Sequence, residues 1–182
     1  MSLKQKVIEE KASEILDENF LTDTILVPIS HICRTEGISI REIDLASDYP
    51  EVAGILVSDS GRFEIRISTS IHKYEKRVTI ARLLGRYILH KDDISKIKAD
   101  EKIENEDDPR MCLFKWAKID SKLNDADKLG LSIILPNKPF IRIWKENNKD
   151  FHRETIADTY CQVPISAFNY RLNMLGLSWK LV

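Results

Sequence analysis

The sequence predicts an α+β fold, in which a small antiparallel sheet of about three strands packs against a helical core and a helical module follows. The sheet is predicted by strand-like alternation in residues 38–43 and by two apolar runs, 54–58 and 63–68, which flank the turn Asp59-Ser60-Gly61. The helical core is predicted by the longest apolar helical pattern of the chain, over residues 74–90.

Helical patterns also precede the first strand. Residues 3–19 carry apolar side chains at helical spacing, so an amphipathic helix is expected there. Pro28 suits the first turn of a short helix over residues 29–36, and Gly37 suits the position that follows the end of that helix.

The second half of the chain is expected to contain a loop followed by helices. Residues 91–110 hold eight acids, five bases and few apolar groups, which is typical of a solvated loop. Residues 111–135 return to a mostly helical pattern. In residues 156–177 two short helical patterns flank Gln162-Val163-Pro164, and Ser166 is expected to cap the second of these helices.

Composition excludes several classes of function. The 182 residues include 28 bases and 29 acids, so the net charge of −1 gives no general attraction to nucleic acid or to an anionic membrane. The three cysteines, at positions 33, 112 and 161, are far apart and form no CxxC pair, so neither a zinc knuckle nor a disulfide framework is indicated. No apolar run approaches the roughly 20 residues that span a bilayer, so a cytoplasmic protein is expected.

Four segments of the chain resemble one known family in order and spacing. Residues 77–90, RVTIARLLGRYILH, resemble the central helix of the ImmA/IrrE metallopeptidases of bacteria and phages, which typically reads RFTIAHELGHYLLH. Residues 54–68, 126–136 and 156–177 resemble further parts of that family. The resemblance implies a zincin-like domain over residues 1–137 and a helix-turn-helix-like module over residues 138–182.

The residues of the family's zinc site are replaced in this sequence. HExxH on a helix presents two His ligands on one face, and the Glu between them serves as general base. Here the ligand positions hold Arg82 and Arg86, the base position holds Leu83, and the position of the third ligand holds Leu123. A guanidinium stays protonated and cannot donate a lone pair to a metal. The resemblance therefore implies a degenerate metallopeptidase with no catalytic residues and no metal or other cofactor.

Two interpretations apply to the arginines of the central helix, which form a stripe with His90 at intervals of four residues. Arg82, Arg86 and His90 are candidates for binding an anion or an acidic partner in the former cleft. Alternatively, the arginines form structural ion pairs with acids that surround the lost third ligand, namely Asp120, Asp125 and Asp127. Because two like charges one helical turn apart repel each other, a counter-charge is expected nearby, and the structural interpretation is favoured.

The C-terminal module also has two interpretations. A DNA-reading helix needs polar and basic residues near its start, and the second helix of the module offers Asn169, Tyr170, Arg171 and Asn173. These four residues are few for a helix that must contact both phosphates and bases. A packing module that completes the fold is therefore favoured.

The leading functional hypothesis is a pseudo-peptidase that regulates another protein by binding it. The resemblance implies a partner such as a helix-turn-helix repressor of a phage or mobile element, or the other member of a toxin–antitoxin-like pair. Two alternatives remain open: an active zinc metallopeptidase with unorthodox ligands, and a DNA-binding transcriptional regulator, which the near-neutral charge disfavours.

Overall fold

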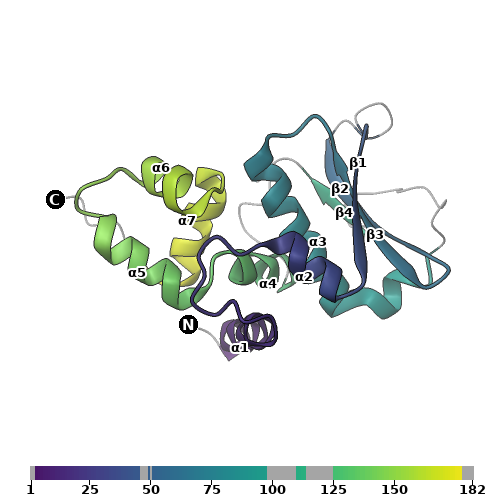
Figure 1. Ribbon diagram of the computed structural model, residues 1–182, viewed down its shortest axis with the longest axis horizontal. Coiled ribbons are helices and arrows are strands. Elements are labelled where there is room, and N and C mark those ends of the chain that lie inside the picture. The colour runs from purple at the N-terminus through teal and green to yellow at the C-terminus, as the bar shows by residue number, and fades with distance from the viewer. Residues whose placement is uncertain (1–2, 46–48, 50, 98–109, 114–124, 178–182) are drawn as a thin grey trace. The chain divides into compact units, whose positions relative to one another are not determined.

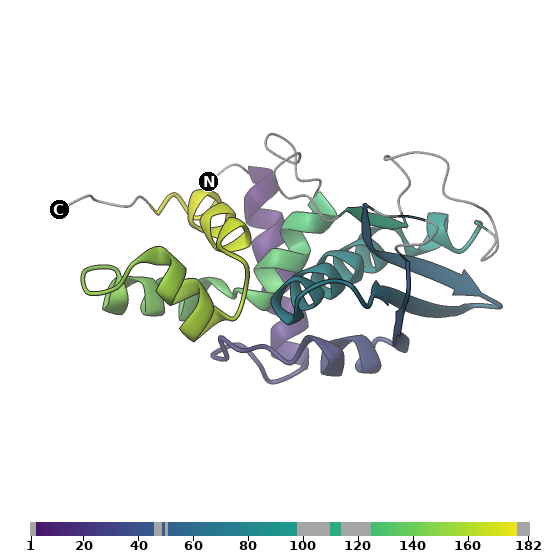
Figure 2. The ribbon, with the colours of Figure 1, turned by 90° about the horizontal axis from the view of Figure 1, so that it is seen from above.

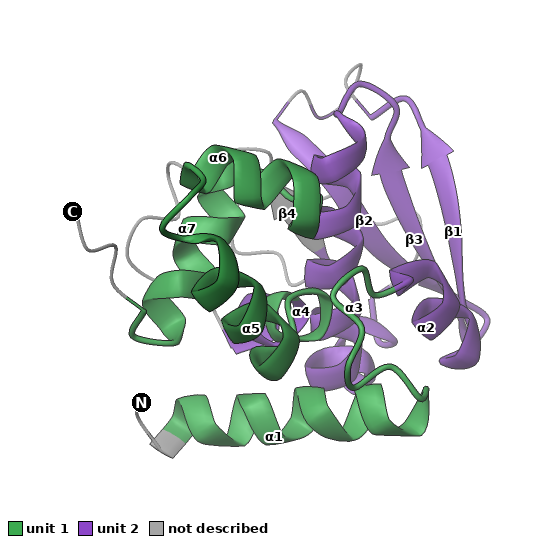
Figure 3. Ribbon diagram, turned by 60° about the vertical axis from the view of Figure 1, so that its left-hand side comes forward, with its two compact units in different colours: residues 1–27, 131–182 green, residues 28–130 purple. Residues whose placement is uncertain are grey.

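A computed structural model describes residues 3–45, 49, 51–97, 110–113 and 125–177. The chain separates into two compact units, and the division falls inside one helix (Figure 3). Unit 1 comprises residues 1–27 and 131–182, and unit 2 comprises residues 28–130. This division differs from the boundary expected between residues 137 and 138, because the N-terminal helix groups with the C-terminal helices. None of the described helices is long and apolar enough to cross a membrane.

Unit 2 contains a sheet of four strands in the order β1-β3-β2-β4. The strands are β1 (Ile38–Ile43), β2 (Val52–Asp59), β3 (Arg62–Ser68) and β4 (Met111–Leu113). The predicted hairpin is confirmed: Ser60 and Gly61 have φ angles of 50° and 77°, and positive φ at both central residues is typical of the tight turns that suit twisted strands.

The prediction of a purely antiparallel sheet is wrong. Strand β1 pairs with β3 in parallel, with Ile40 opposite Ile65, whereas β2 pairs antiparallel with β3 and with β4. The reason is the strand order, in which β3 lies between β1 and β2. Strand β1 therefore pairs with β3, the second strand of the hairpin, and β3 runs in the same direction as β1. The sheet is therefore mixed, and the α+β class holds.

Helices α2 (Ile29–Thr35) and α3 (Lys73–Ile94) complete the predicted core of unit 2. Helix α3 lies against one face of the sheet (Figure 1) and is seen along most of its length from above (Figure 2). It approaches β2 closely, because a Cβ atom added to Gly54 would lie 2.9 Å from Cγ2 of Thr79. The helices predicted over residues 29–36 and 74–90 are thus confirmed, and each begins within one residue of its predicted start.

Two expectations for the middle of the chain are corrected. Helix α3 continues to Ile94, so the first residues of the expected loop 91–110 are helical, and the fully buried Ile94 explains this extension. The expected helical pattern of residues 111–135 begins instead with strand β4, and of the residues described in this stretch α4 (Asp125–Ile134) is helical, whereas residues 114–124 fall outside the described part of the chain. Three residues are too few to show strand alternation, so no pattern in the sequence predicted β4.

Unit 1 is helical. Besides the end of α4, its elements are α1 (Leu3–Glu18), α5 (Asn137–Asn147), α6 (Arg153–Ile156), the π-helix η2 (Ala157–Cys161) and α7 (Ile165–Met174). Helix α5 was not predicted, whereas α1 and the helices on both sides of Gln162-Val163-Pro164 were. The rings of Phe140 and Phe168 lie 5.2 Å apart at the centre of the C-terminal helices.

The predicted cap at Ser166 is wrong. Helix α7 begins at Ile165 directly after Pro164, and no side chain caps it. Proline before the first helical residue already fixes the backbone for helix entry, which moves Ser166 inside the first turn.

Candidate functional site

The candidate site lies on the buried turns of α3 in unit 2. Arg82 and Arg86 are only 2% and 7% exposed, and they stand one helical turn apart on this helix. Two cations at this spacing repel each other, and burial strengthens the repulsion, so the site requires a counter-charge.

Asp127 of α4 supplies that counter-charge and is itself 2% exposed. Its Oδ2 accepts a hydrogen bond from Nη2 of Arg82 at 3.0 Å, and its Oδ1 accepts one from Nη1 of Arg86. Arg86 also donates from Nη1 to the carbonyl oxygen of Arg82 at 3.3 Å. We call Arg82, Arg86 and Asp127 the buried ion-pair cluster.

The other sequence candidates lie apart from this cluster. Asp125 forms an ion pair with Lys128, whose Nζ is 3.6 Å from its Oδ1. His90 is on the exposed end of α3, whereas Leu83 is fully buried in the core. Asp120 and Leu123 fall outside the described residues.

A close crossing of α3 and α4 sets the geometry of the buried ion-pair cluster. A Cβ atom on Gly85 would lie 2.0 Å from the carbonyl oxygen of Ala126, and one on Gly130 would lie 2.2 Å from that of Ala81. Both distances are far below any tolerated contact, so only glycine allows the two backbones to meet here. Because Asp127 follows Ala126 directly, this crossing places its carboxylate opposite Arg82 and Arg86.

The electrostatics of the cluster favour the ionised carboxylate. Burial acts to raise the pKa of Asp127, but the charges of Arg82 and Arg86 and the hydrogen bonds from them outweigh it and hold the pKa below its usual value. Asp127 is therefore an anion at neutral pH, and the cluster is a charged network rather than a neutral one.

This arrangement can tie two helices together but offers no ligand set. A guanidinium has no lone pair for a metal, and each oxygen of Asp127 already accepts a hydrogen bond from an arginine. Within the part of the chain that the structure describes, no three His, Cys, Asp or Glu side chains are close enough together to hold a metal ion.

The two cysteines whose side chains the structure describes do not offer an alternative nucleophile. Cys33 and Cys161 are buried. Burial, aided by the nearby charge of Glu36, raises the pKa of Cys33 to about 12, so its thiol is protonated at neutral pH. The side chain of Cys112 is outside the described part of the chain.

Unit 1 contains a second charged network that sequence reasoning missed. Arg171 of α7 is completely buried and pairs through both Nη atoms with the carboxylate of Glu9 on α1. Its Nε donates to the carbonyl oxygen of Leu135 at 2.8 Å, and Ser132 donates to Oε1 of Glu9 at 2.9 Å. Burial acts to raise the pKa of Glu9, but the hydrogen bond and charge of Arg171 hold it below its usual value.

The second network removes Arg171 from the set of side chains that were considered for reading DNA. An arginine with no exposed surface cannot reach a phosphate or a base. No sequence signal identified this, because Glu9 and Arg171 are 162 positions apart.

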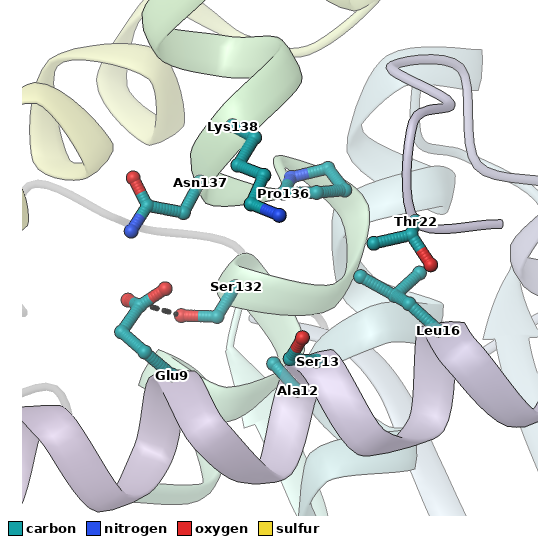
Figure 4. A pocket seen from close by; sticks show the side chains of 9 residues that line it. All are labelled: Glu9, Ala12, Ser13, Leu16, Thr22, Ser132, Pro136, Asn137 and Lys138. Atoms are coloured by element: carbon teal, nitrogen blue, oxygen red, sulfur yellow. Dashed lines mark hydrogen bonds between the residues drawn. The ribbon is translucent and has the colours of Figure 1, made fainter.

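A pocket of about 130 Å³ lies beside this network in unit 1 (Figure 4). Glu9 and Ser132 line it, and the hydrogen bond between them is visible in the figure. Because Glu9 also accepts from Gln5 and Arg171, its carboxylate is already well satisfied by the protein. The pocket has room for a few water molecules and shows no arrangement of catalytic groups.

No protein-family model, curated protein or solved structure matches the chain.

Proposed function

We propose that this protein is a non-catalytic, zincin-like relative of the ImmA/IrrE metallopeptidases that acts in the cytoplasm by binding and regulating another protein. The observation that carries the proposal is the buried ion-pair cluster. Arg82 and Arg86 occupy the two positions at which the resembled family has its His ligands, and both are engaged by Asp127.

The cluster supports a loss of catalysis for a chemical reason. In the resembled family a metal joins the central helix to the following one, whereas here a carboxylate shared by two guanidinium groups makes that connection. Leu83, at the position of the general base, is fully buried and has no group that can accept a proton. The cluster thus preserves a link between the helices while abolishing the hydrolytic site.

Regulation by binding follows from the resemblance. Proteins of that family act on repressors of phages, mobile elements and stress responses, so a helix-turn-helix repressor is the expected kind of partner. The burial of Arg171 also weighs against the alternative of a DNA-binding regulator, because it leaves α7 with fewer exposed cations for phosphate contacts.

Metal analysis tests the loss of the zinc site. We expect the purified wild-type protein to contain far less than one zinc per chain and to keep its melting temperature in the presence of a chelator. The variant Arg82→His with Arg86→His places two imidazoles opposite Asp127 and should gain zinc affinity, because two His and one carboxylate form a common ligand set.

The control for this gain is the same double variant combined with Asp127→Asn, which should lose the acquired zinc affinity. Neither variant should hydrolyse peptides, because Leu83 still denies the general base. About one tightly bound zinc per wild-type chain would contradict the proposal.

Co-purification from the native host tests the regulatory role. We expect a repressor-like protein to be recovered with the wild-type chain and to remain uncleaved after prolonged incubation with added zinc. Arg86→Met should leave this association unchanged, because the cluster is buried and acts as a structural tie. Cleavage of the recovered protein, or its release by a chelator, would refute a purely binding role.

A further inference from the structure

Helix α1 ends in a backbone motif that normally requires glycine. The N–H of Leu21 donates a hydrogen bond to the carbonyl oxygen of Leu16 at 2.8 Å, and the N–H of Phe20 donates one to the carbonyl oxygen of Asp17 at 3.1 Å. This pair of bonds is the Schellman motif, in which the residue at the position of Phe20 adopts a left-handed conformation. Phe20 has a φ angle of +58°, in agreement with this motif.

Phenylalanine is unfavourable at this position for two separate reasons. A side chain with a Cβ atom is strained in the left-handed conformation, which explains the usual glycine. The ring of Phe20 is also 94% exposed, so it gains almost nothing from burial. Folding of the chain therefore does not account for this residue, and its strained backbone conformation indicates a function, such as contact with another molecule.

The surroundings of Phe20 identify the chemistry of that other molecule. Residues 12–33 contain four acids and no Lys or Arg. Three of these acids, Asp17, Glu18 and Asp23, are exposed near Phe20, and we call these four residues the acidic knob. Such a surface is repelled by anionic lipid and by phosphate, and it fits an apolar hollow that is surrounded by basic side chains.

Helix α5 of the same unit carries a hollow of this kind. Lys138, Arg142 and Lys145 follow one another at intervals of four and three residues and are exposed on one face of the helix. They surround the half-buried Ile141 in a shallow hollow of about 560 Å³, which Glu146 also lines. Among the described residues, none of the three bases has an acid within 4.0 Å. We call this surface the α5 hollow.

We propose that the acidic knob of one chain docks in the α5 hollow of a second copy of this chain. Thr22, two residues after Phe20, and Lys138 of the α5 hollow line the same pocket, so knob and hollow are neighbours within unit 1 (Figure 4). A patch that contains a projection beside its complement suits a two-fold symmetric dimer, in which each chain contributes both halves. The inference does not depend on the proposed function, because the buried ion-pair cluster belongs to unit 2.

The first test replaces the aromatic anchor. Sedimentation equilibrium over a concentration series should show a monomer–dimer equilibrium for the wild type that weakens with added salt. Phe20→Gly should weaken dimerisation by about 30-fold, as expected for an aromatic hot spot. The melting temperature of this variant, measured at a concentration where the protein is monomeric, should equal or exceed that of the wild type, because glycine suits the left-handed conformation. Phe151→Ser is the matched control: it removes another exposed ring of unit 1, 43% exposed, and should leave dimerisation unchanged.

The second test exchanges the charges. Glu18→Lys with Asp23→Lys makes the knob basic, and Arg142→Glu with Lys145→Glu makes the hollow acidic. Each double variant should remain monomeric by itself, and an equimolar mixture should form a heterodimer in which both contacts pair opposite charges. A wild type that stays monomeric up to about 1 mM would overturn the proposal. A mixture of the two variants that does not associate would overturn it as well.

Discussion

Asp127→Asn is the most informative single change, because it removes a charge from the buried ion-pair cluster without altering its volume. Asp127 accepts hydrogen bonds from Arg82 and Arg86, and all three residues are at most 7% exposed. Its neutralisation leaves two buried guanidinium groups, which repel each other, without the carboxylate that they share. Removing one partner from a buried ion pair lowers stability by about 3–5 kcal/mol. That loss is a large part of the about 5–15 kcal/mol that stabilises a typical domain.

Two further variants separate the ion-pair cluster from ordinary packing effects. Arg86→Met leaves Asp127 paired with Arg82, so we expect a smaller loss of about 1.5–3 kcal/mol, comparable to a charged hydrogen bond. The combination Arg82→Met, Arg86→Met and Asp127→Leu leaves no buried charge in the cluster and should recover most of the stability that Asp127→Asn loses. As a control on the same helix, Asp93→Asn disrupts an exposed ion pair with Lys96 and should leave stability nearly unchanged.

Urea unfolding followed by circular dichroism measures these differences, and hydrogen exchange of the α3 amides assigns them to unit 2. The order of the losses in unfolding free energy is the decisive result. The loss for Asp127→Asn should be larger than that for Arg86→Met, and the triple variant should be nearly as stable as the wild type. A loss below about 1 kcal/mol for Asp127→Asn would refute a buried structural ion pair. A triple variant as unstable as Asp127→Asn would show that packing, and not charge, dominates at this crossing.

Two further predictions concern pH and the helix crossing. The carboxyl groups of Asp127 and Glu9 have pKa values below their usual range in the folded chain, so the unfolded chain takes up protons first as the pH falls. Stability should therefore be constant near neutral pH and decrease below about pH 5, and Glu9→Gln should reduce the slope of that decrease in a denaturation series. Gly85→Ala should lower the free energy of unfolding by about 3 kcal/mol or more, because its Cβ would lie 2.0 Å from the carbonyl oxygen of Ala126. In the control Gly61→Ala, the added Cβ meets no atom within 4 Å, so only the strain of its positive φ, about 1–2 kcal/mol, should appear. Equal losses for the two glycine variants would contradict a direct contact between the helix backbones.

Local patterns were sufficient for most elements of this protein. The apolar spacing of residues 74–90 predicted α3, and the turn Asp59-Ser60-Gly61 with its flanking apolar runs predicted the hairpin. In both cases the residues that form the predictive pattern are the same residues that form the helix or the hairpin. Helix α5 was missed because its buried side chains, Pro139, Phe140, Ile143 and Trp144, are few, and such a helix depends on tertiary packing.

The sequence by itself also determined which chemical groups occupy the candidate site. Arg82, Arg86 and Leu83 cannot form the zinc site that the resemblance describes, whatever the fold around them. It narrowed the counter-charge to Asp120, Asp125 or Asp127 but could not choose among them.

Tertiary structure decided the choice, because it depends on where two helices cross. Glycine at positions 85 and 130 allows the backbones of α3 and α4 to touch, and this contact places Asp127 opposite both arginines. The sequence also could not predict the pairing of Glu9 with Arg171 or the parallel pairing of β1 with β3. Each of these pairings joins segments that are far apart in the chain, and the local pattern of one segment does not identify the other. The physical reason is that a charge or a strand edge determines what kind of partner it needs but not where in the chain that partner lies.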